Sequence, residues 1–226
     1  MSLIARHGTA WPGEARQGEA GHGKARLQQK SKRRDQMAIT KTVQKHVVEK
    51  GRTEIIFDRY PGDNKTELTP EQKMYLLPDK TVVLPALNII SFLTATNTES
   101  APKAMLDSRE YKTVAAALLS SVQITPNYIP FLRNGKPIVF GEFIDDVDKK
   151  SGIRVVYHVA RLPKGVPNPK VRPMLSLPWS LEFDITIFPH PELTIEMIES
   201  MFKDGGERLG YGTFRKAFGK FYHSWS

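Results

Sequence analysis

Hydrophobic and polar residues follow one another in several short stretches that are typical of β-strands. From Trp179 to Ile187 they alternate with period two, which predicts a strand with one buried and one exposed face. The β-branched and apolar runs Thr53–Arg59 and Thr81–Leu84 predict two buried strands. A last short strand is expected from Gly219 to Tyr222. These several predicted strands argue against an all-helical protein.

Turn residues separate other apolar runs so closely that the flanking strands are expected to pair with each other. The dipeptide Asn134-Gly135 lies between two such runs and favours a tight hairpin turn. Residues 148–152 separate a second pair of predicted strands, 143–147 and 153–159. Hairpins of this kind give antiparallel neighbours.

Helical patterns alternate with these strands. Thr69-Pro70 predicts the start of a short helix. Pro85 is expected to open a helix that ends near Leu93, with Leu87, Ile90 and Leu93 on one side. Asp107 is expected to cap a helix that ends near Ser120. Thr194 is expected to cap a helix that buries Ile195, Ile198 and Phe202, and Gly205-Gly206 to end it.

Together these elements predict an α+β fold with a mainly antiparallel sheet and helices on one face. Residues 37–226 are expected to form a single domain, since no linker or second core divides them.

Residues 1–36 differ from the rest of the chain. Gly-Glu-Ala, Gly-Glu-Ala and Gly-Lys-Ala begin at positions 13, 18 and 23, and a period of five residues matches neither a helix nor a strand. We expect a disordered, basic, low-complexity tail, and Met37 could be the natural start of the protein. Alternatively, this tail is an arm that binds phosphates.

Charge is spread unevenly along the chain. The net charge of +9 divides into +5 on residues 1–36 and +4 on the remaining residues. The predicted domain is therefore only mildly basic, and net charge alone does not identify a polyanionic partner.

Composition excludes several classes of protein. The chain has no cysteine, which excludes disulfides, thiolate metal sites and cysteine nucleophiles. Its longest apolar run is far shorter than the about 20 residues that span a bilayer, and no signal peptide is visible at the N-terminus. We expect a cytoplasmic protein, in the host cell if it is viral, without a membrane partner and without a cofactor or metal.

The stretch from Asp204 to Phe221 is the strongest candidate for function. It combines five glycines with aromatic and basic residues. Backbone N–H groups freed by glycine can hold a phosphate, cations can neutralise it, and aromatic rings can stack on bases. We expect RNA or single-stranded DNA to bind here through Arg208, Gly210, Tyr211, Gly212, Phe214, Arg215, Lys216 and Lys220.

A basic loop, residues 162–173, could add Lys170 and Arg172 to that surface, although a simple solvated loop is the favoured explanation. Asp58-Arg59-Tyr60, at the end of a predicted strand, has two interpretations. Arg59 and Tyr60 contact nucleic acid, or Asp58 and Arg59 form a local ion pair.

Two resemblances bear on this interpretation. The pattern Leu209-Gly210-Tyr211-Gly212, six residues, Gly219-Lys220-Phe221 is similar to the C-terminal glycine-rich loop of the RAMP superfamily of CRISPR effector subunits, with a gap one residue longer and Phe221 in place of the last glycine. Residues 84–93 resemble the strand-Pro-helix entry of the same superfamily. This resemblance implies a ferredoxin-like, RRM-type core and contact with RNA or single-stranded DNA. Residues 172–221 also resemble a group of uncharacterised bacteriophage proteins.

Other interpretations of the glycine-rich stretch remain open. Its glycines can serve close backbone packing and its aromatics the core, or the surface can bind a protein, as an assembly subunit, a homo-oligomer or an inhibitor of a host system.

An enzyme is the minority interpretation. Asp63, or the group of Asp145, Asp146 and Asp148 with Glu142, could serve a metal-dependent nuclease. His46 or His158 could serve as a lone general base. Turn-forming aspartates and ordinary strand histidines explain these residues without catalysis.

Overall fold

The computed structural model describes residues 38–226 apart from residue 64 and residues 162–166, and these form one compact unit. The predicted disordered tail, residues 1–36, lies outside the described residues. No helix in the described part of the chain is long and apolar enough to cross a membrane.

A mainly antiparallel sheet forms the centre of the unit, as the hydrophobic pattern predicts. β1 (Val43–Gly51) lies in the middle, between β12 (Phe221–Trp225) and β11 (Ser180–Ile187). On the far edge of β11 lie β4 (Val122–Thr125) and the short hairpin of β6 (Leu132–Arg133) and β7 (Lys136–Pro137). The strand β1 was not predicted, because its buried face contains a carboxylate, Glu49, where an apolar residue is expected.

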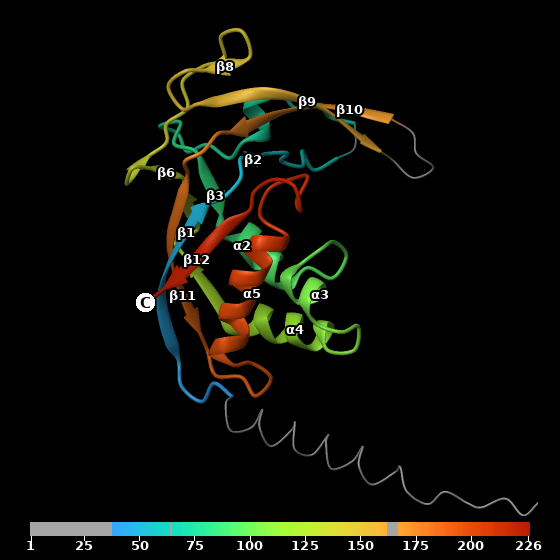
Figure 1. Ribbon diagram of the computed structural model, residues 1–226, viewed down its shortest axis with the longest axis vertical. Coiled ribbons are helices and arrows are strands. Elements are labelled where there is room, and N and C mark those ends of the chain that lie inside the picture. The colour runs from blue at the N-terminus through green and yellow to red at the C-terminus, as the bar shows by residue number, and fades with distance from the viewer. Residues whose placement is uncertain (1–37, 64, 162–166) are drawn as a thin grey trace, which may run out of the picture. The chain divides into compact units, whose positions relative to one another are not determined.

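Four helices cover one face of this sheet (Figure 1): α2 (Ala86–Thr94), α3 (Ala101–Met105), α4 (Tyr111–Ser121) and α5 (Ile195–Arg208). Along the chain, β1 is followed by helices, then β4, β11, α5 and β12, and the four strands lie in the order β12, β1, β11, β4. This is the arrangement of a ferredoxin-like β-α-β-β-α-β core. The predicted α+β fold class is confirmed.

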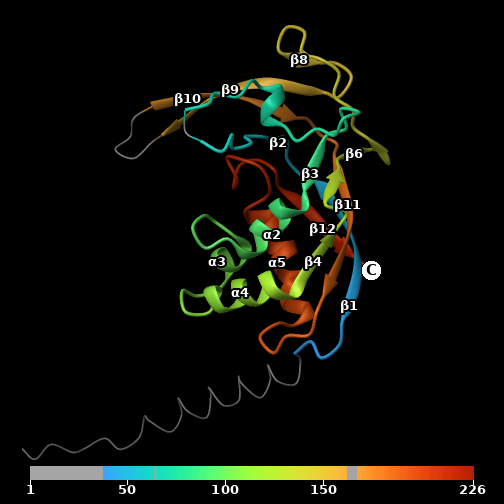
Figure 2. The same cartoon turned by 180° about the vertical axis from the view of Figure 1, so that it is seen from behind.

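A second sheet arches over one end of the first, as both views show (Figure 2). It consists of β2 (Ile55–Ile56), β10 (Pro167–Leu175), β9 (Ile153–Arg161) and β8 (Val147–Asp148), all antiparallel. The prediction of a loop over residues 162–173 is therefore wrong from Pro167 onward. The three prolines of β10 suggested a loop, yet β10 pairs with β9 along its whole length.

Short elements connect the two sheets. The strands β3 (Val83–Pro85) and β5 (Tyr128–Pro130) pair with each other, and η1 (Glu71–Lys73) is a single 3-10 turn. The predicted hairpin at Asn134-Gly135 is confirmed: both residues have positive φ, 53° and 72°, as a tight two-residue turn requires.

The apolar side predicted for α2 differs in part from the side that the structure buries. Leu87 is 76% exposed, and the buried residues of the helix are Ala86, Ile89, Phe92 and Leu93. The helix packs against both α4 and the loop beside β12, so its buried stripe is rotated away from Leu87.

The predicted start of α5 is confirmed and its predicted end is wrong. The Thr194 hydroxyl accepts a hydrogen bond from the Met197 N–H at 3.1 Å. The helix continues through Gly205 and Gly206 to Arg208. A Cβ on Gly205 would lie 2.6 Å from Phe92 Cζ, and one on Gly206 2.6 Å from the Phe221 ring. These glycines let α5 approach its neighbours closely, and they do not end it.

Candidate nucleic-acid interface

The glycine-rich stretch after α5 forms a compact loop between the two sheets. Gly210 and Gly219 have φ of 77° and 71° and lie so close that a Cβ on Gly210 would be 2.5 Å from the Gly219 carbonyl oxygen. Gly212, also at 77°, approaches the Ile56 carbonyl of β2. The hydrogen bonds from Tyr211 N–H to Gly219 O and from Thr213 N–H to Ile56 O, both 2.9 Å, hold these approaches in place. The loop therefore needs its glycines for its own shape.

Tyr211 does not face solvent, and its predicted role in base stacking is wrong. The side chain is 2% exposed, and its ring stacks on Phe221 at 4.5 Å and meets Phe92 edge-on at 5.1 Å. Its hydroxyl donates to Glu49 Oε1 at 3.1 Å. The ring packs in the core because the positive φ of Gly210 turns the next side chain inward.

The partner of Tyr211 is a fully buried carboxyl group. Burial raises the pKa of Glu49 well above its ordinary value, and the hydrogen bond from Tyr211 opposes that rise. His223 lies 3.5 Å from the same carboxyl oxygen, and burial lowers its pKa to about 4. Burial therefore favours the neutral form of both side chains.

Arg172 is also interior, which contradicts its predicted place on an exposed loop. It is 5% exposed and forms an ion pair with Asp58 at 2.6 Å. Its guanidinium lies 4.9 Å from the centre of the Phe214 ring, and His158 packs on that ring at 5.2 Å. Arg172 therefore anchors the loop through its contact with the ring of Phe214, which is half-buried.

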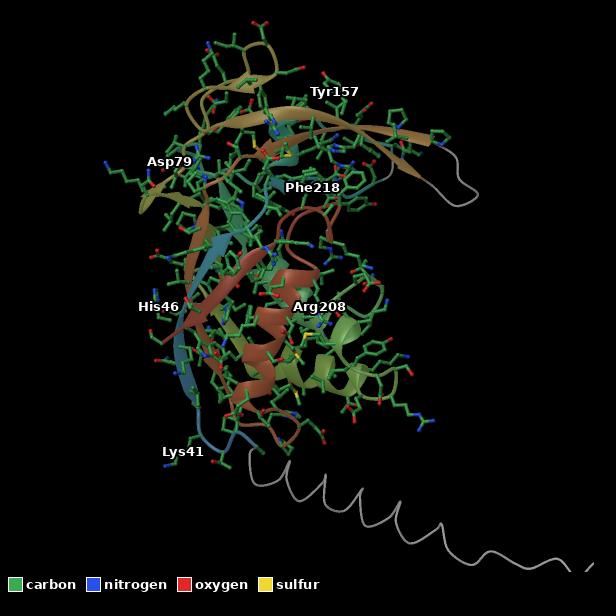
Figure 3. The ribbon with its side chains drawn as sticks, in the orientation of Figure 1. Lys41, His46, Asp79, Tyr157, Arg208 and Phe218 are labelled. Atoms are coloured by element: carbon green, nitrogen blue, oxygen red, sulfur yellow. The ribbon has the colours of Figure 1, made fainter. Side chains whose placement is uncertain are left out.

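The remaining predicted residues differ in exposure. Arg208 and Lys216 are exposed, whereas Lys170, Arg215 and Lys220 are partly buried. Figure 3 shows Arg208 at the end of α5, and Phe218 on the side of the loop that faces β9 and β10. The Lys216 Nζ atom lies 3.8 Å from Glu99 Oε1. Burial lowers the pKa of Arg215 and the charge of Glu99 raises it, and the group stays a cation at neutral pH.

Three backbone N–H groups of the loop have no acceptor among the described residues: those of Gly212, Phe214 and Arg215. Gly212 and Phe214 have positive φ, 77° and 50°. Only the N–H groups of Phe214 and Arg215 are successive, since the Thr213 N–H donates to Ile56 O. Successive N–H groups in such a turn can bind an anion, and Arg215 adds a cationic side chain.

Gly212 and Arg215 border a hollow of about 450 Å³. One wall is the loop from Gly210 to Thr213 together with Arg215, a second is the segment from Phe57 to Tyr60 with Tyr75, and a third is the polar side of α2 with Asn88 and Ser91. Its volume lies in the range of small-molecule sites. Tertiary structure thus brings together three segments that are far apart in the sequence.

Arg59 and Tyr60 are the exposed cation and aromatic ring of this hollow. Tyr60 is 61% exposed, and the Arg59 guanidinium lies 5.5 Å from the centre of the Tyr75 ring. Asp58 pairs with Arg172, so the alternative of a local Asp58–Arg59 ion pair is wrong. Sequence reasoning named Arg59 and Tyr60 as one of two possibilities and missed Tyr75 and Asn88, which carry no local signal.

Several of the aspartates considered for catalysis have structural partners. The Asp63 carboxylate accepts hydrogen bonds from the N–H groups of Lys65 and Thr66, which lower its pKa. Asp146 accepts from the Tyr157 hydroxyl at 2.9 Å. Across the described part of the chain, no three His, Asp or Glu residues lie together as a metal site would need.

The chain was compared with family models, curated proteins and solved structures, and similar chains were found among the solved structures. No family model and no curated protein sequence matches the chain. Among solved structures, a chain of the type III-B Cmr-beta complex, bound to cognate target RNA, is similar with a TM-score of 0.47 and 9% identity, over 92% of this chain and 67% of that chain. At this level of similarity, we draw no functional conclusion from it. The resemblance to bacteriophage proteins stays a prediction.

Proposed function

We propose that this protein binds RNA or single-stranded DNA, without catalysis, in the hollow beside the glycine-rich loop. The observation that carries this proposal is a pair of N–H groups, those of Gly212 and Arg215, that have no acceptor among the described residues and belong to residues at the edge of a hollow, next to the cationic side chain of Arg215. A phosphate is the anion that such a set fits, and the exposed ring of Tyr60 offers a surface for an unpaired base.

The proposal keeps part of the predicted residue set and replaces the rest. Gly210, Gly212 and Arg215 border the hollow, while Arg208, Lys216 and Lys220 contribute positive charge from around the loop. Tyr60 and Arg59 take the roles that were predicted for Tyr211 and Arg172.

The test is a fluorescence anisotropy titration of the full chain with labelled single strands of about twelve nucleotides, over a range of salt concentrations. We expect a double variant, Arg59→Ala with Arg215→Ala, to bind roughly 10- to 100-fold more weakly at low salt. Two lost phosphate contacts should make the salt slope less negative by about 1.4.

A matched control removes the same charge elsewhere. Lys136 and Lys150 are exposed and line a different hollow, beside Arg133. The variant Lys136→Ala with Lys150→Ala should lose less than about threefold in affinity. Equal losses in the two double variants, or no binding of any strand at low salt, would exclude the proposed site.

A second candidate function is association with a protein, possible because an apolar face is exposed. Tyr157 and Val159 on β9 are 67% and 59% exposed, and Tyr157 lies on the side of β9 away from the loop (Figure 3). Val159 faces Pro169 across the pair of strands. A stable oligomer in light scattering, dissociated by Tyr157→Ser with Val159→Ser, together with no binding of single strands, would favour this function.

A further inference from the structure

A second hollow, of about 570 Å³, lies next to the first. Arg59 lines both, whereas Tyr60 lines only the first and Pro61 only the second. Residues 59–61 therefore form a ridge between two hollows. Each hollow has a volume in the range of small-molecule sites.

The second hollow is lined by apolar and polar residues, and the polar ones include Glu71, whose carboxylate pairs with Lys80 at 3.5 Å. Met74 is buried, Leu68 and Leu76 are half-buried, and Pro61 is exposed on the ridge. At the rim, the Gln72 Oε1 atom accepts from the Thr69 N–H at 3.0 Å, which fixes the amide and leaves its NH₂ group without an acceptor among the described residues. A flat apolar ring with hydrogen-bonding edges, such as a nucleobase, suits these walls.

The ridge itself carries a cation. Arg59 is exposed, and in the described part of the chain no carboxylate lies within ion-pair distance of it. Its backbone N–H is bonded to Lys73 O at 3.1 Å, and its guanidinium lies over Tyr75. A ligand that occupies both hollows has to cross this side chain, and a phosphodiester crossing it would neutralise the charge.

We infer that the site takes two consecutive nucleotides of a single strand, one base in each hollow, with their linking phosphate on Arg59. This inference rests on the proposed function and names its smallest complete ligand. A base in either hollow cannot be paired with a second strand at the same time, so a duplex does not fit.

The experiment compares a uridine mononucleotide with a uridine dinucleotide as competitors of a labelled single strand on the full chain. The dinucleotide should bind roughly tenfold more tightly, which is in the lower part of the range for placing one more base against a protein surface. In Leu68→Trp, where a larger side chain fills the second hollow, we expect this ratio to fall to about one while the mononucleotide binds as before. Leu119→Trp, at an exposed position of α4, is the matched control and should keep the ratio.

A second measurement needs no change in the second hollow. A dinucleotide with a neutral methylphosphonate link should bind the wild type several-fold more weakly than the natural one, and Arg59→Ala should bind both equally. The inference would be overturned if the wild type bound the dinucleotide no more tightly than the mononucleotide, or if Leu68→Trp kept the preference for the dinucleotide. Either result would do so even if longer strands bind through Arg59 and Arg215. If no strand binds at all, the proposed function itself falls.

Discussion

At the scale of single residues, burial decides which of the chemically suitable side chains are available. Tyr211 and Arg172 have the chemistry of nucleic-acid contacts, and both are in the interior, where they bind Glu49 and Asp58. The charge and aromatic character expected on the surface are supplied by Arg59 and Tyr60 instead. A residue's type restricts its possible roles, and its solvent exposure selects among them.

The buried carboxyl group of Glu49 leads to a prediction about pH. Its pKa is raised in the folded protein, so above pH 4.5 the unfolded chain releases this proton before the folded protein does. The free energy of unfolding should therefore fall as pH rises from 4.5 toward the folded pKa. Glu49→Gln has no such titrating group, so its free energy of unfolding should not fall for this reason. The difference in free energy of unfolding between Glu49→Gln and the wild type should therefore grow by up to about 1.4 kcal/mol per pH unit in that window.

Chemical denaturation of both proteins across a pH series measures the effect. The control is Glu182→Gln, which changes an exposed carboxylate on the neighbouring strand β11 and should leave the pH dependence unaltered. A constant difference between Glu49→Gln and the wild type would show that the native carboxyl titrates normally.

At the scale of elements, close packing overrides local preference. Gly205 and Gly206 would end a helix in isolation, but α5 continues through them because Phe92 and Phe221 occupy the space where their side chains would be. Helical propensity alone favours alanine at such positions by about 1 kcal/mol.

We therefore expect Gly205→Ala to destabilise the protein, against its helical propensity. A Cβ there would lie 2.6 Å from Phe92 Cζ and 3.0 Å from Ala101 Cβ, and overpacking of this kind costs about 1–3 kcal/mol. Chemical denaturation gives the free energy of unfolding. Glu207→Ala, at an exposed position of the same helix, should change it by less than about 0.5 kcal/mol. Unchanged or increased stability in Gly205→Ala would mean that the packing here is looser than described.

At the scale of the whole molecule, charge and core are separated along the chain. Residues 38–226 form one compact unit, while residues 1–36 carry +5 of the net charge of +9. We expect deletion of residues 1–36 to change the free energy of unfolding by less than about 0.5 kcal/mol.

The same deletion should weaken binding of single strands several-fold at low salt and little at physiological salt, because long-range attraction is screened there. Thermal denaturation and the anisotropy titration measure the two effects. A large loss of stability would show that the segment contributes to the fold.

The sequence by itself determined the alternation of strands and helices, the hairpin at Asn134-Gly135, the Thr194 cap and hence the α+β class. Each of these depends on neighbouring residues, so it can be recognised from local patterns. It also singled out the glycine-rich loop, because glycine spacing is a local property.

Only the tertiary structure decided which side chains surround that loop. The hollow combines Arg59, Asn88 and Arg215 from three distant segments, and it exists because the ferredoxin-like core brings β2, α2 and the loop together. The burial of Tyr211 and Arg172 likewise depends on partners more than a hundred residues away. No local sequence pattern predicts such contacts. They form only in the complete fold, where core packing offsets the entropy cost of closing the long loops between the partners.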